Sequence, residues 1–522
     1  MTVQDSATPQ GGAETVLVIG AGMAGLALAL ALDGSGKRVV LIERDAEPPE
    51  LEPQDAFERW KRPGVSQFRY SHVFVGRLHD LLRSRYPELT EQLQRAGLRA
   101  SDFSEGLPPT LRASYVPHAE DSRMVSLCGR RATLEYVLRR YVGRLAHVSF
   151  VHGAVAQGLA VERAGDVLRV VGVELKRGDA RETLRGDLVV DAGGRNSPVQ
   201  GWLSALGGRI DVHEQSAQFA YFCRHYRLRE GEVEPDHSDV SGDLDYLKYA
   251  IFFGEPGHFA VAFGCAEQEL ELIALMRRAD AFDELCRQFP QLARWLDRSE
   301  PVSKVLGAAK IVNRWARIAR SPRVLGLFLT GDAGFEANPI YGRGCAAAFV
   351  QSHLLAQTLV QEPRAERRAA KYEAALRAEL GPYHRASMVA DQVFHDRSER
   401  ARGASASWLQ RLQMHAYEHV VMPALLVDMV VVREILNVMS MGKPAGPLRI
   451  ARFAWRVLWA WLRRAGRAVQ ALPPGLPRTD LLTRVRAALP APREGQSARE
   501  ELREEPPEEP SEQPPLVLGS RD

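Results

Sequence analysis

The segment Thr15-Val-Leu-Val-Ile-Gly-Ala-Gly-Met-Ala-Gly25 joins a short apolar run to three closely spaced glycines. The β-branched run predicts a buried strand, and the Ala- and Leu-rich stretch Leu26 to Leu32 predicts a helix directly after the glycines. Glycine at these positions lets the chain turn tightly, lets a phosphate group approach the backbone and lets the helix pack close to the strand. The free N–H groups at the N-terminus of such a helix attract a pyrophosphate. The segment therefore predicts the start of a dinucleotide-binding domain.

The next apolar run, Arg38 to Ile42, predicts a second strand that ends in Glu43. An acid at this position can accept hydrogen bonds from the ribose hydroxyls of a nucleotide. Strand, helix, strand and acid thus agree on a nucleotide site. The pattern does not by itself distinguish FAD from NAD.

A second motif, Leu-Thr-Gly-Asp-Ala-Gly-Phe-Glu-Ala-Asn-Pro-Ile-Tyr-Gly-Arg-Gly, occupies residues 329 to 344. The run Val324 to Thr330 predicts a strand, and the small-residue stretch Cys345 to Val360 predicts a helix. Asp332 can accept hydrogen bonds from ligand hydroxyls, and the helix N-terminus suits an anionic reduced flavin. Alone, this motif is equally an ordinary strand–turn–helix connection with a solvated Asp332. Combined with the first motif, it predicts the flavin end of an FAD site.

With these motifs the chain resembles FAD-dependent monooxygenases of the class A aromatic hydroxylase and squalene epoxidase type, over residues 14 to 385 and more loosely to 465. The resemblance implies that Asp332 binds the flavin ribityl chain and Glu43 the ribose. The family's phosphate-binding arginine, which opens a helix before Leu-Glu, matches Arg131. The stretch 338 to 344 is closer to epoxidase-like and halogenase-like members than to simple phenol hydroxylases. The predicted cofactor-binding residues are Gly20, Gly22, Gly25, Glu43, Arg44, Arg131, Asp332, Pro339, Gly342 and Gly344.

The activity implied by this resemblance is oxygen activation by the flavin itself. NAD(P)H or a separate reductase reduces FAD, and reduced flavin reacts with O₂ to give a C4a-hydroperoxide. This species inserts one oxygen atom into a hydrophobic small molecule, by hydroxylation or epoxidation. The cofactor supplies the difficult chemistry while the protein positions it and excludes water, so neither a Ser-His-Asp set nor a metal site is expected.

Two positions depart from the family pattern. In Asp191-Ala-Gly-Gly-Arg-Asn-Ser197, Gly193 stands where the family usually has an aspartate. Because that motif has been associated with both FAD and nicotinamide binding, direct NADPH use is in question. The histidine that often follows Gly-Asp-Ala is replaced near Phe335, which marks a subfamily.

The predicted fold is α/β: a Rossmann-like FAD-binding domain of the glutathione-reductase type, an inserted, mainly antiparallel β-sheet substrate domain and a C-terminal helical region. We place the FAD domain at 14–200 and 305–385, with its strands interleaved, and the substrate or roof domain at 201–304. The helical region follows at 386–490. Disordered segments are expected at 1–13 and, because of its Glu- and Pro-rich composition, at 491–522.

Two polar residues precede a helix predicted from Val73 to Leu82, in a segment that lies near the flavin in epoxidase-like relatives. Arg69 and His72 are therefore candidates for catalytic work. They are equally a structural arginine and a packed or helix-capping histidine. The aromatic strands Phe219 to Tyr226, Tyr246 to Phe253 and Phe259 to Cys265 can roof a flavin, but any half-buried antiparallel sheet has this pattern.

Composition narrows the possible partners and the compartment. The 522-residue chain has a net charge of only +3, so no nucleic-acid partner is indicated. Its five cysteines are scattered and odd in number, which favours a reducing, cytoplasmic compartment over a disulfide framework. The first thirteen residues show no secretory signal pattern.

The stretch Arg449 to Ala471 predicts a basic amphipathic helix with three tryptophans. Such a helix can lie in a membrane interface, which makes peripheral membrane contact one interpretation. The other is a surface helix that packs its apolar face on the FAD domain. The apolar run His419 to Val432 is too short to span a bilayer.

Three other functions fit the same scaffold. A flavin-dependent halogenase would be expected to carry Trp-x-Trp-x-Ile-Pro and a lysine near the flavin, whereas the only Trp-x-Trp here, at 459 to 461, is followed by Leu-Arg. A flavin-dependent reductase of prenyl chains tolerates variants such as that at Gly193. The third is a non-catalytic flavoprotein scaffold. No residue identifies the substrate.

Overall fold

The computed structural model describes residues 13–107, 109–113, 115–237, 240–321, 323–405, 408–425, 427–442, 447–464 and 476–489. The segments 1–12 and 491–522, predicted to be disordered, lie outside the described residues, as does 465–471 of the predicted amphipathic helix. The element order begins with a strand, a helix and a strand, as the glycine fingerprint predicts.

A five-stranded parallel sheet forms the centre of the FAD domain, in the order β20-β10-β1-β2-β6. Its strands are β1 (Thr15–Ile19), β2 (Arg38–Glu43), β6 (Val148–His152), β10 (Leu188–Asp191) and β20 (Leu327–Leu329). They are short and strongly apolar, as strands covered on both faces are. The chain order is interleaved, because β10 and β20 come from much later in the sequence. The predicted α/β fold class is therefore confirmed.

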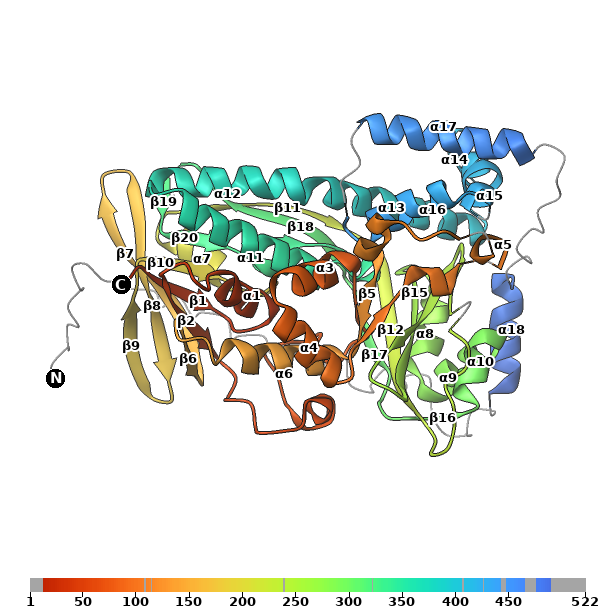
Figure 1. Cartoon of the computed structure of the whole chain (residues 1–522), viewed down its shortest axis with the longest axis horizontal. Coiled ribbons are helices and arrows are strands. Elements are labelled where there is room, and N and C mark those ends of the chain that lie inside the picture. The colour runs from red at the N-terminus through yellow and green to blue at the C-terminus, as the bar shows by residue number, and fades with distance from the viewer. Residues whose placement is uncertain are drawn as a thin grey trace, which may run out of the picture.

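Two helices from opposite ends of this domain lie side by side beside the sheet (Figure 1). They are α1 (Met23–Ala31), directly after the glycine fingerprint, and α11 (Gly344–Gln361), directly after the second motif. Nearly every residue of α1 is buried, which fits its Ala- and Leu-rich composition. A third helix, α6 (Arg131–Val142), packs on α1.

A second sheet lies at one end of the molecule, at the left of Figure 1. It contains β7 (Ala154–Ala164), β8 (Val167–Arg177), β9 (Ala180–Arg185) and β19 (Arg323–Leu325). The strand predicted from Val324 to Thr330 is therefore two strands, β19 and β20, in different sheets. Gly326 separates them with φ +78, a conformation that other residues rarely adopt.

The roof is a six-stranded sheet with the path β13-β14-β15-β12-β16 and β17 paired to β12. All of its printed pairings are antiparallel, and its aromatic strands match the predicted ones closely. Its members are β12 (Phe219–Leu228), β13 (Ser241–Leu244), β14 (Leu247–Phe253), β15 (His258–Ala266), β16 (Ser299–Pro301) and β17 (Leu306–Ala308). One face packs on α8 (Leu270–Arg277), α9 (Ala279–Arg287) and α10 (Pro290–Leu296).

Two further small sheets connect these parts. β11 (Ile210–Ser216), β18 (Val312–Ile318) and β21 (Phe335–Glu336) join the two sides of the roof insertion to the second motif. β3 (Val73–Phe74), β5 (Ser126–Cys128) and β4 (Arg99–Ser101) form the other. The helix predicted from Val73 to Leu82 is thus wrong at its start. Val73 and Phe74 pair with β5, and the helix α3 (Gly76–Arg85) begins after them.

The C-terminal region is helical. It contains α12 (Ala365–Glu379), α13 (Gly381–Ala401), α14 (Trp408–Ala416), α15 (Met422–Leu425), α16 (Met429–Met439), α17 (Pro447–Arg464) and α18 (Arg478–Ala488). The last of these packs on α9 and adds to the hydrophobic core of the roof. Among the described residues, no helix has both the length and the hydropathy to cross a bilayer.

Candidate functional site

The two sequence motifs meet in space. Gly331 has φ +63, and a Cβ there would lie 2.6 Å from the Cβ of Ala24 in α1. The Ser352 hydroxyl of α11 donates to the carbonyl of Ala24 at 3.0 Å. Close packing of glycine and alanine thus brings the N-terminal halves of α1 and α11 together, with Asp332 at their junction.

The glycine fingerprint combines tight packing with open space. Gly20 has φ +96, and a Cβ there would lie 2.7 Å from the Ala192 carbonyl oxygen of β10's end. A Cβ at Gly25 would overlap the carbonyl of Gly20. By contrast, nothing lies within 4 Å of the position of a Cβ at Gly22 or at Gly344. Both open positions are at helix N-termini, which is where a phosphate or flavin could approach the backbone.

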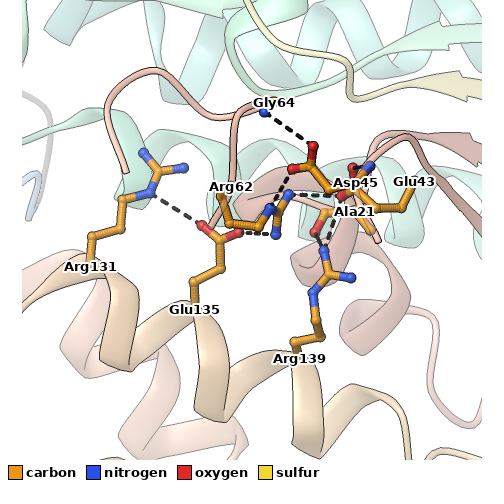
Figure 2. Close-up of polar contacts among 8 residues, drawn as sticks. All are labelled: Ala21, Glu43, Asp45, Arg62, Gly64, Arg131, Glu135 and Arg139. Carbon is orange, nitrogen blue, oxygen red and sulfur yellow. Dashed lines mark hydrogen bonds and ion pairs between the residues drawn. The ribbon is translucent and has the colours of Figure 1, made fainter. Parts of the chain in front are cut away.

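A buried network of arginines and carboxylates surrounds the end of β2 (Figure 2). Arg62 donates to three carboxylates: Glu43 at 2.8 Å, Asp45 at 2.8 Å and Glu135 at 2.6 Å. Arg139 donates to Glu43 at 3.0 Å. These side chains are all nearly inaccessible to solvent, and with Arg131, which pairs with Glu135, the network holds three arginines and three carboxylates.

Arg139 also connects this network to the glycine fingerprint. Its Nη2 donates to the carbonyl of Ala21 at 2.6 Å, between two of the glycines. Its Nε and Nη1 are buried and have no hydrogen-bond partner in the described part of the chain. Buried N–H groups are rarely left unpaired, so an anionic ligand beside the fingerprint would satisfy them. The residues present therefore fit a pyrophosphate.

Glu43, the predicted ribose ligand, is ionised in this environment. Burial alone would raise its pKa, but the neighbouring Arg62 and Arg139 outweigh that effect and lower it. The carboxylate accepts from Arg62, Arg139 and the backbone N–H of Asp45. A carboxylate can accept about four hydrogen bonds, so one position remains for a ribose hydroxyl.

The other predicted residues at this end differ in position. Arg131 opens α6 as predicted and pairs with Glu135 at 3.3 Å. It also lies near enough to Asp332 for its charge to oppose the rise in the pKa of that carboxyl. The side chain of Arg44 is exposed and lies beside Gly64, and it makes no hydrogen bond or ion pair with the network among the described residues.

Asp332 lies among cations. Burial raises the pKa of its carboxyl above the usual range, while Arg131, Arg195 and Arg314 oppose that shift. Arg314 donates to the backbone carbonyls of Asp332 at 3.3 Å and Ala333 at 3.0 Å, which fixes the turn. The carboxyl is thus held in place by its backbone and can accept from a ribityl hydroxyl.

Glu336, four residues later, is a second acid at this point. Burial and the repulsion of Asp332 raise its pKa to about 8. Its Oε2 is buried and has no hydrogen-bond partner among the described residues, while Arg195 lies 3.4 Å from Oε1. Glu336 therefore carries a proton at neutral pH.

The loop Asn338 to Gly344 is held by the C-terminal helices. Asp391 of α13 accepts from Asn313 at 2.6 Å, from Asn338 at 2.8 Å and from the Tyr341 hydroxyl at 2.7 Å. Arg343 donates to the Ser387 hydroxyl of α13 at 2.8 Å. The loop that precedes α11 is therefore held in place by α13.

Gly342 and Pro339 lie within this loop. Gly342 has φ +64, and a Cβ there would lie 2.9 Å from Cγ1 of Val73. The backbone of the loop therefore packs directly on β3, which follows the segment that contains His72. Pro339 opens a short 3₁₀ turn, Pro339–Tyr341, whose N-cap is Asn338.

A pocket lies between the segment Tyr70–His72 and the roof. Its cavity volume is ≈ 10 Å³, and its lining includes Tyr70, His72, Arg130, His225, Phe252 and Phe259. This volume is about what a single water molecule needs and far below that of a site for a drug-sized ligand. The pocket therefore admits a substrate group only when the side chains that line it move apart.

Two histidines of this pocket are neutral. Burial and the nearby Arg131 lower the pKa of His72 to about 3, and burial lowers that of His225 to about 4. Nδ1–H of His72 donates to the carbonyl of Tyr70 at 2.8 Å, and Nε2–H of His225 donates to that of Arg69 at 2.8 Å. Each ring therefore keeps one unprotonated nitrogen as an acceptor.

Arg69 lies outside this pocket. Its guanidinium is exposed, donates to the carbonyl of Glu58 at 3.2 Å and lies 5.8 Å from the ring centre of Phe57. Of the two predicted catalytic residues, only His72 lines the pocket.

Gly193 lies in a local turn directly after β10. Asp191 accepts from the N–H of Gly193 at 2.9 Å and from the Ser197 hydroxyl at 2.8 Å, and burial raises its pKa to about 6. A Cβ at Gly193 would lie 3.1 Å from the Asp191 carboxylate. Asp191 thus already holds the turn, and a second acid at 193 would be repelled by it.

Sequence reasoning missed Arg62, Arg139, Glu135 and Asp391. The α6 residues had a signal, because Arg131, Glu135 and Arg139 are spaced by four and share one helix face. Arg62 and Asp391 had none, since their partners lie far away in the sequence.

Known proteins share this fold. The model of the FAD binding domain family matches residues 15–48, which contain β1, α1 and β2. No curated protein matches the sequence. Among solved structures, the flavin-dependent brominase Bmp2 superposes with a TM-score of 0.56 at 15% identity, covering 86% of this chain and 99% of that one.

Two oxygenases superpose similarly. The anhydrotetracycline hydroxylase OxyS from Streptomyces rimosus gives a TM-score of 0.53 at 20% identity and covers 82% of this chain and 75% of that one. PqsL from Pseudomonas aeruginosa, a probable FAD-dependent monooxygenase, gives 0.53 at 19% identity and covers 74% and 96%. The chain therefore has the fold that flavin-dependent monooxygenases and halogenases share, as the sequence resemblance predicts.

Proposed function

We propose that this protein is an FAD-dependent monooxygenase that inserts one oxygen atom from O₂ into a hydrophobic small molecule. The observation that carries the proposal is the meeting of the two motifs. Gly331 packs on Ala24, so that Asp332 and the N-termini of α1 and α11 lie together. A single FAD has a pyrophosphate for one motif and a ribityl chain and ring for the other.

The chain's own residues hold the cofactor in this proposal. The N-terminus of α1, with the open approach at Gly22, binds the pyrophosphate with Arg139 and Arg131. Glu43 takes the ribose and Asp332 the ribityl hydroxyls. The loop from Pro339 to Gly344 and the N-terminus of α11 receive the flavin ring. When bound, FAD supplies the oxygen-activating chemistry.

The aromatic pocket supplies the substrate side. When its side chains move apart to admit a substrate, it excludes water from the ring and presents His72 as a neutral hydrogen-bond acceptor that can orient a substrate hydroxyl. Arg69 contributes only its backbone carbonyl, which fixes His225. The complex of PqsL with 2-aminobenzoylacetate supports an aromatic small molecule as the substrate class.

The electron donor in this proposal is NAD(P)H or a separate reductase. Stopped-flow mixing with NADH and NADPH, in the presence and absence of candidate substrates, decides between them. Bleaching of the flavin absorbance by either nucleotide identifies the donor. A flavin that neither nucleotide reduces requires a partner reductase. Oxygen uptake coupled to product formation supports the monooxygenase, and reduction of substrate without oxygen uptake contradicts it.

A flavin-dependent halogenase is the second candidate. It is favoured by the superposition on the brominase Bmp2, which covers 99% of that chain. A turnover that requires bromide or chloride and yields a halogenated product would establish it. Product formation that is unchanged without halide would remove it.

The proposal also includes where in the cell the protein is located. All five cysteines are free and buried, which supports a reducing, cytoplasmic environment. Peripheral contact with a membrane through the C-terminal helices is developed below.

A further inference from the structure

The helix α17 has a narrow packed apolar side and a broad exposed one that adjoins it. One side packs on α15 and α16 through Val457 and Ala460, which are 6% and 5% exposed. On the opposite side Trp455 is 66% exposed, and Trp461, beside the packed side, is 45% exposed. Since α17 already packs by its inner side, the expectation that it packs these tryptophans on the FAD domain is wrong.

The exposed side forms one continuous surface. At about 100° per residue its apolar side chains cover roughly half of the helix circumference, from Ile450 and Trp461 beside Val457 round to Trp459 on the far side. We call this set the α17 surface: Ile450, Trp455, Leu458, Trp459, Trp461 and Leu462, all between 38% and 66% exposed. Figure 1 shows α17 along the upper edge of the molecule.

The charge of this helix has one sign. Residues 447 to 464 contain five arginines and no Asp or Glu. Arg456 pairs with Asp428 at 3.1 Å, on the packed side. Arg452 and Arg463 are exposed beside the α17 surface, and Arg463 lies 4.7 Å from the ring centre of Trp459.

A second exposed tryptophan helix lies nearby. α14 carries Trp408 and Leu412, 70% and 57% exposed, and both α14 and α17 pack on the turn Tyr417–Val421. Scattered apolar residues are normal on protein surfaces, but a concentration of this kind marks an interaction site.

We propose that the α17 surface binds an anionic lipid membrane, with the helix lying in the plane of the interface. Tryptophan and leucine enter the boundary between headgroups and acyl chains, while Arg452 and Arg463 reach lipid phosphates. A helix of 18 residues is about 27 Å long, so it provides an extended contact without spanning the bilayer. The absence of acidic residues in α17 favours an anionic surface over a second copy of this helix. The proposal does not depend on the flavin chemistry.

The test is co-sedimentation of the full-length protein with vesicles of phosphatidylcholine alone or with about one third phosphatidylglycerol. The protein binds the anionic vesicles several-fold better, and high salt weakens this binding. The variant Trp455→Ser/Trp461→Ser binds at least about tenfold less well to anionic vesicles. The variant Arg452→Gln/Arg463→Gln loses the preference for anionic lipid.

Leu270→Ser is the matched control, because Leu270 is 71% exposed on α8 of the roof. It binds vesicles like the wild type. Far-UV circular dichroism and flavin content confirm that each variant is folded.

Three results would overturn the proposal. The wild type could remain in the supernatant with anionic vesicles at low salt, which would leave an acidic protein as the partner. The tryptophan variant could sediment as well as the wild type. Finally, the protein could self-associate without vesicles in a way that the tryptophan variant abolishes, which would assign the surface to a second copy.

Discussion

Two arginine-rich helices of this protein, α6 and α17, place their positive charges in different environments. In α6, Arg131 and Arg139 are buried and paired with Glu135 and Glu43. In α17, Arg452 and Arg463 are exposed, and the helix itself has no acid. Burial of an arginine is tolerated only with a partner, so α6 required its carboxylates to be in place.

The environment of the arginines decides what kind of ligand each helix is suited to bind. The arginines of α6 are fixed from several sides, which suits a ligand of defined shape such as a pyrophosphate. The exposed Arg452 and Arg463 of α17 are free to adapt, which suits a surface without a fixed pattern of charge. The buried arginines are suited to hold a cofactor in place, and the exposed arginines are suited to bring the protein to a membrane surface.

The largest effect is expected on the α6 side. Arg139→Ala leaves Glu43 with one arginine fewer in a buried site and removes the donors that face the fingerprint. The free energy of unfolding falls by about 3–5 kcal/mol, and the protein no longer retains FAD. Chemical denaturation and the flavin absorbance of the purified protein measure both quantities.

Arg140→Ala is the control for this change, because Arg140 is the exposed neighbour on the same helix. It alters stability by less than about 0.5 kcal/mol. Retention of stoichiometric FAD by Arg139→Ala would show that α6 does not form the cofactor site.

The next largest effect is expected at Asp391 of α13. Its hydrogen bonds hold the loop 338–344 in place, as ion pairs hold the arginines of α6. Asp391→Asn places an amide donor against Asn313, Asn338 and Tyr341, which all donate to this position. We expect a loss of about 1–3 kcal/mol in stability and a turnover at least about tenfold lower, with FAD still bound. Steady-state oxygen uptake measures the turnover.

The exposed neighbour Gln392→Ala is the control here, and its turnover stays unchanged. A wild-type turnover in Asp391→Asn would mean that the position of the loop 338–344 does not limit the reaction.

A smaller effect concerns pH. The pKa of Glu336 is raised to about 8 in the folded protein, above its unfolded value. Its contribution to stability is therefore complete below the unfolded pKa and is lost as the pH rises through about 8. In the wild type the free energy of unfolding, measured by thermal unfolding, falls by up to about 1.4 kcal/mol per pH unit between the unfolded pKa and about 8. In Glu336→Gln it does not fall in this way. Equal pH profiles for the two proteins would contradict the raised pKa of Glu336; Glu300→Gln, exposed on the roof, serves as the control.

The smallest effect is expected on α17. Arg452→Gln alters the stability of the protein by less than about 0.5 kcal/mol and leaves FAD content unchanged, because Arg452 is exposed. Denaturation curves and flavin spectra measure this. A large loss of stability would show that Arg452 helps to hold α17 in place, as the ion-paired arginines do in α6.

The sequence predicts the cofactor site where the signals are local. The glycines at 20, 22 and 25 require their conformations for short-range reasons, and Asp332 follows directly from a strand end. Arg62 could not be assigned, because its three carboxylates lie 17 to 73 residues away along the chain. The strand at Val73 and Phe74 was missed because its partner, β5, is equally distant in sequence. In α17 the periodicity locates the apolar residues, but only the structure shows that the helix packs by its narrower side.

The measurement that tests the central claim most directly is the flavin content of the purified protein and of Asp332→Ala, determined from the absorbance of released FAD. The account predicts close to one FAD per chain in the wild type and a marked loss in the variant. A colourless wild-type protein that takes up no added FAD, or a variant that retains it fully, would contradict the account.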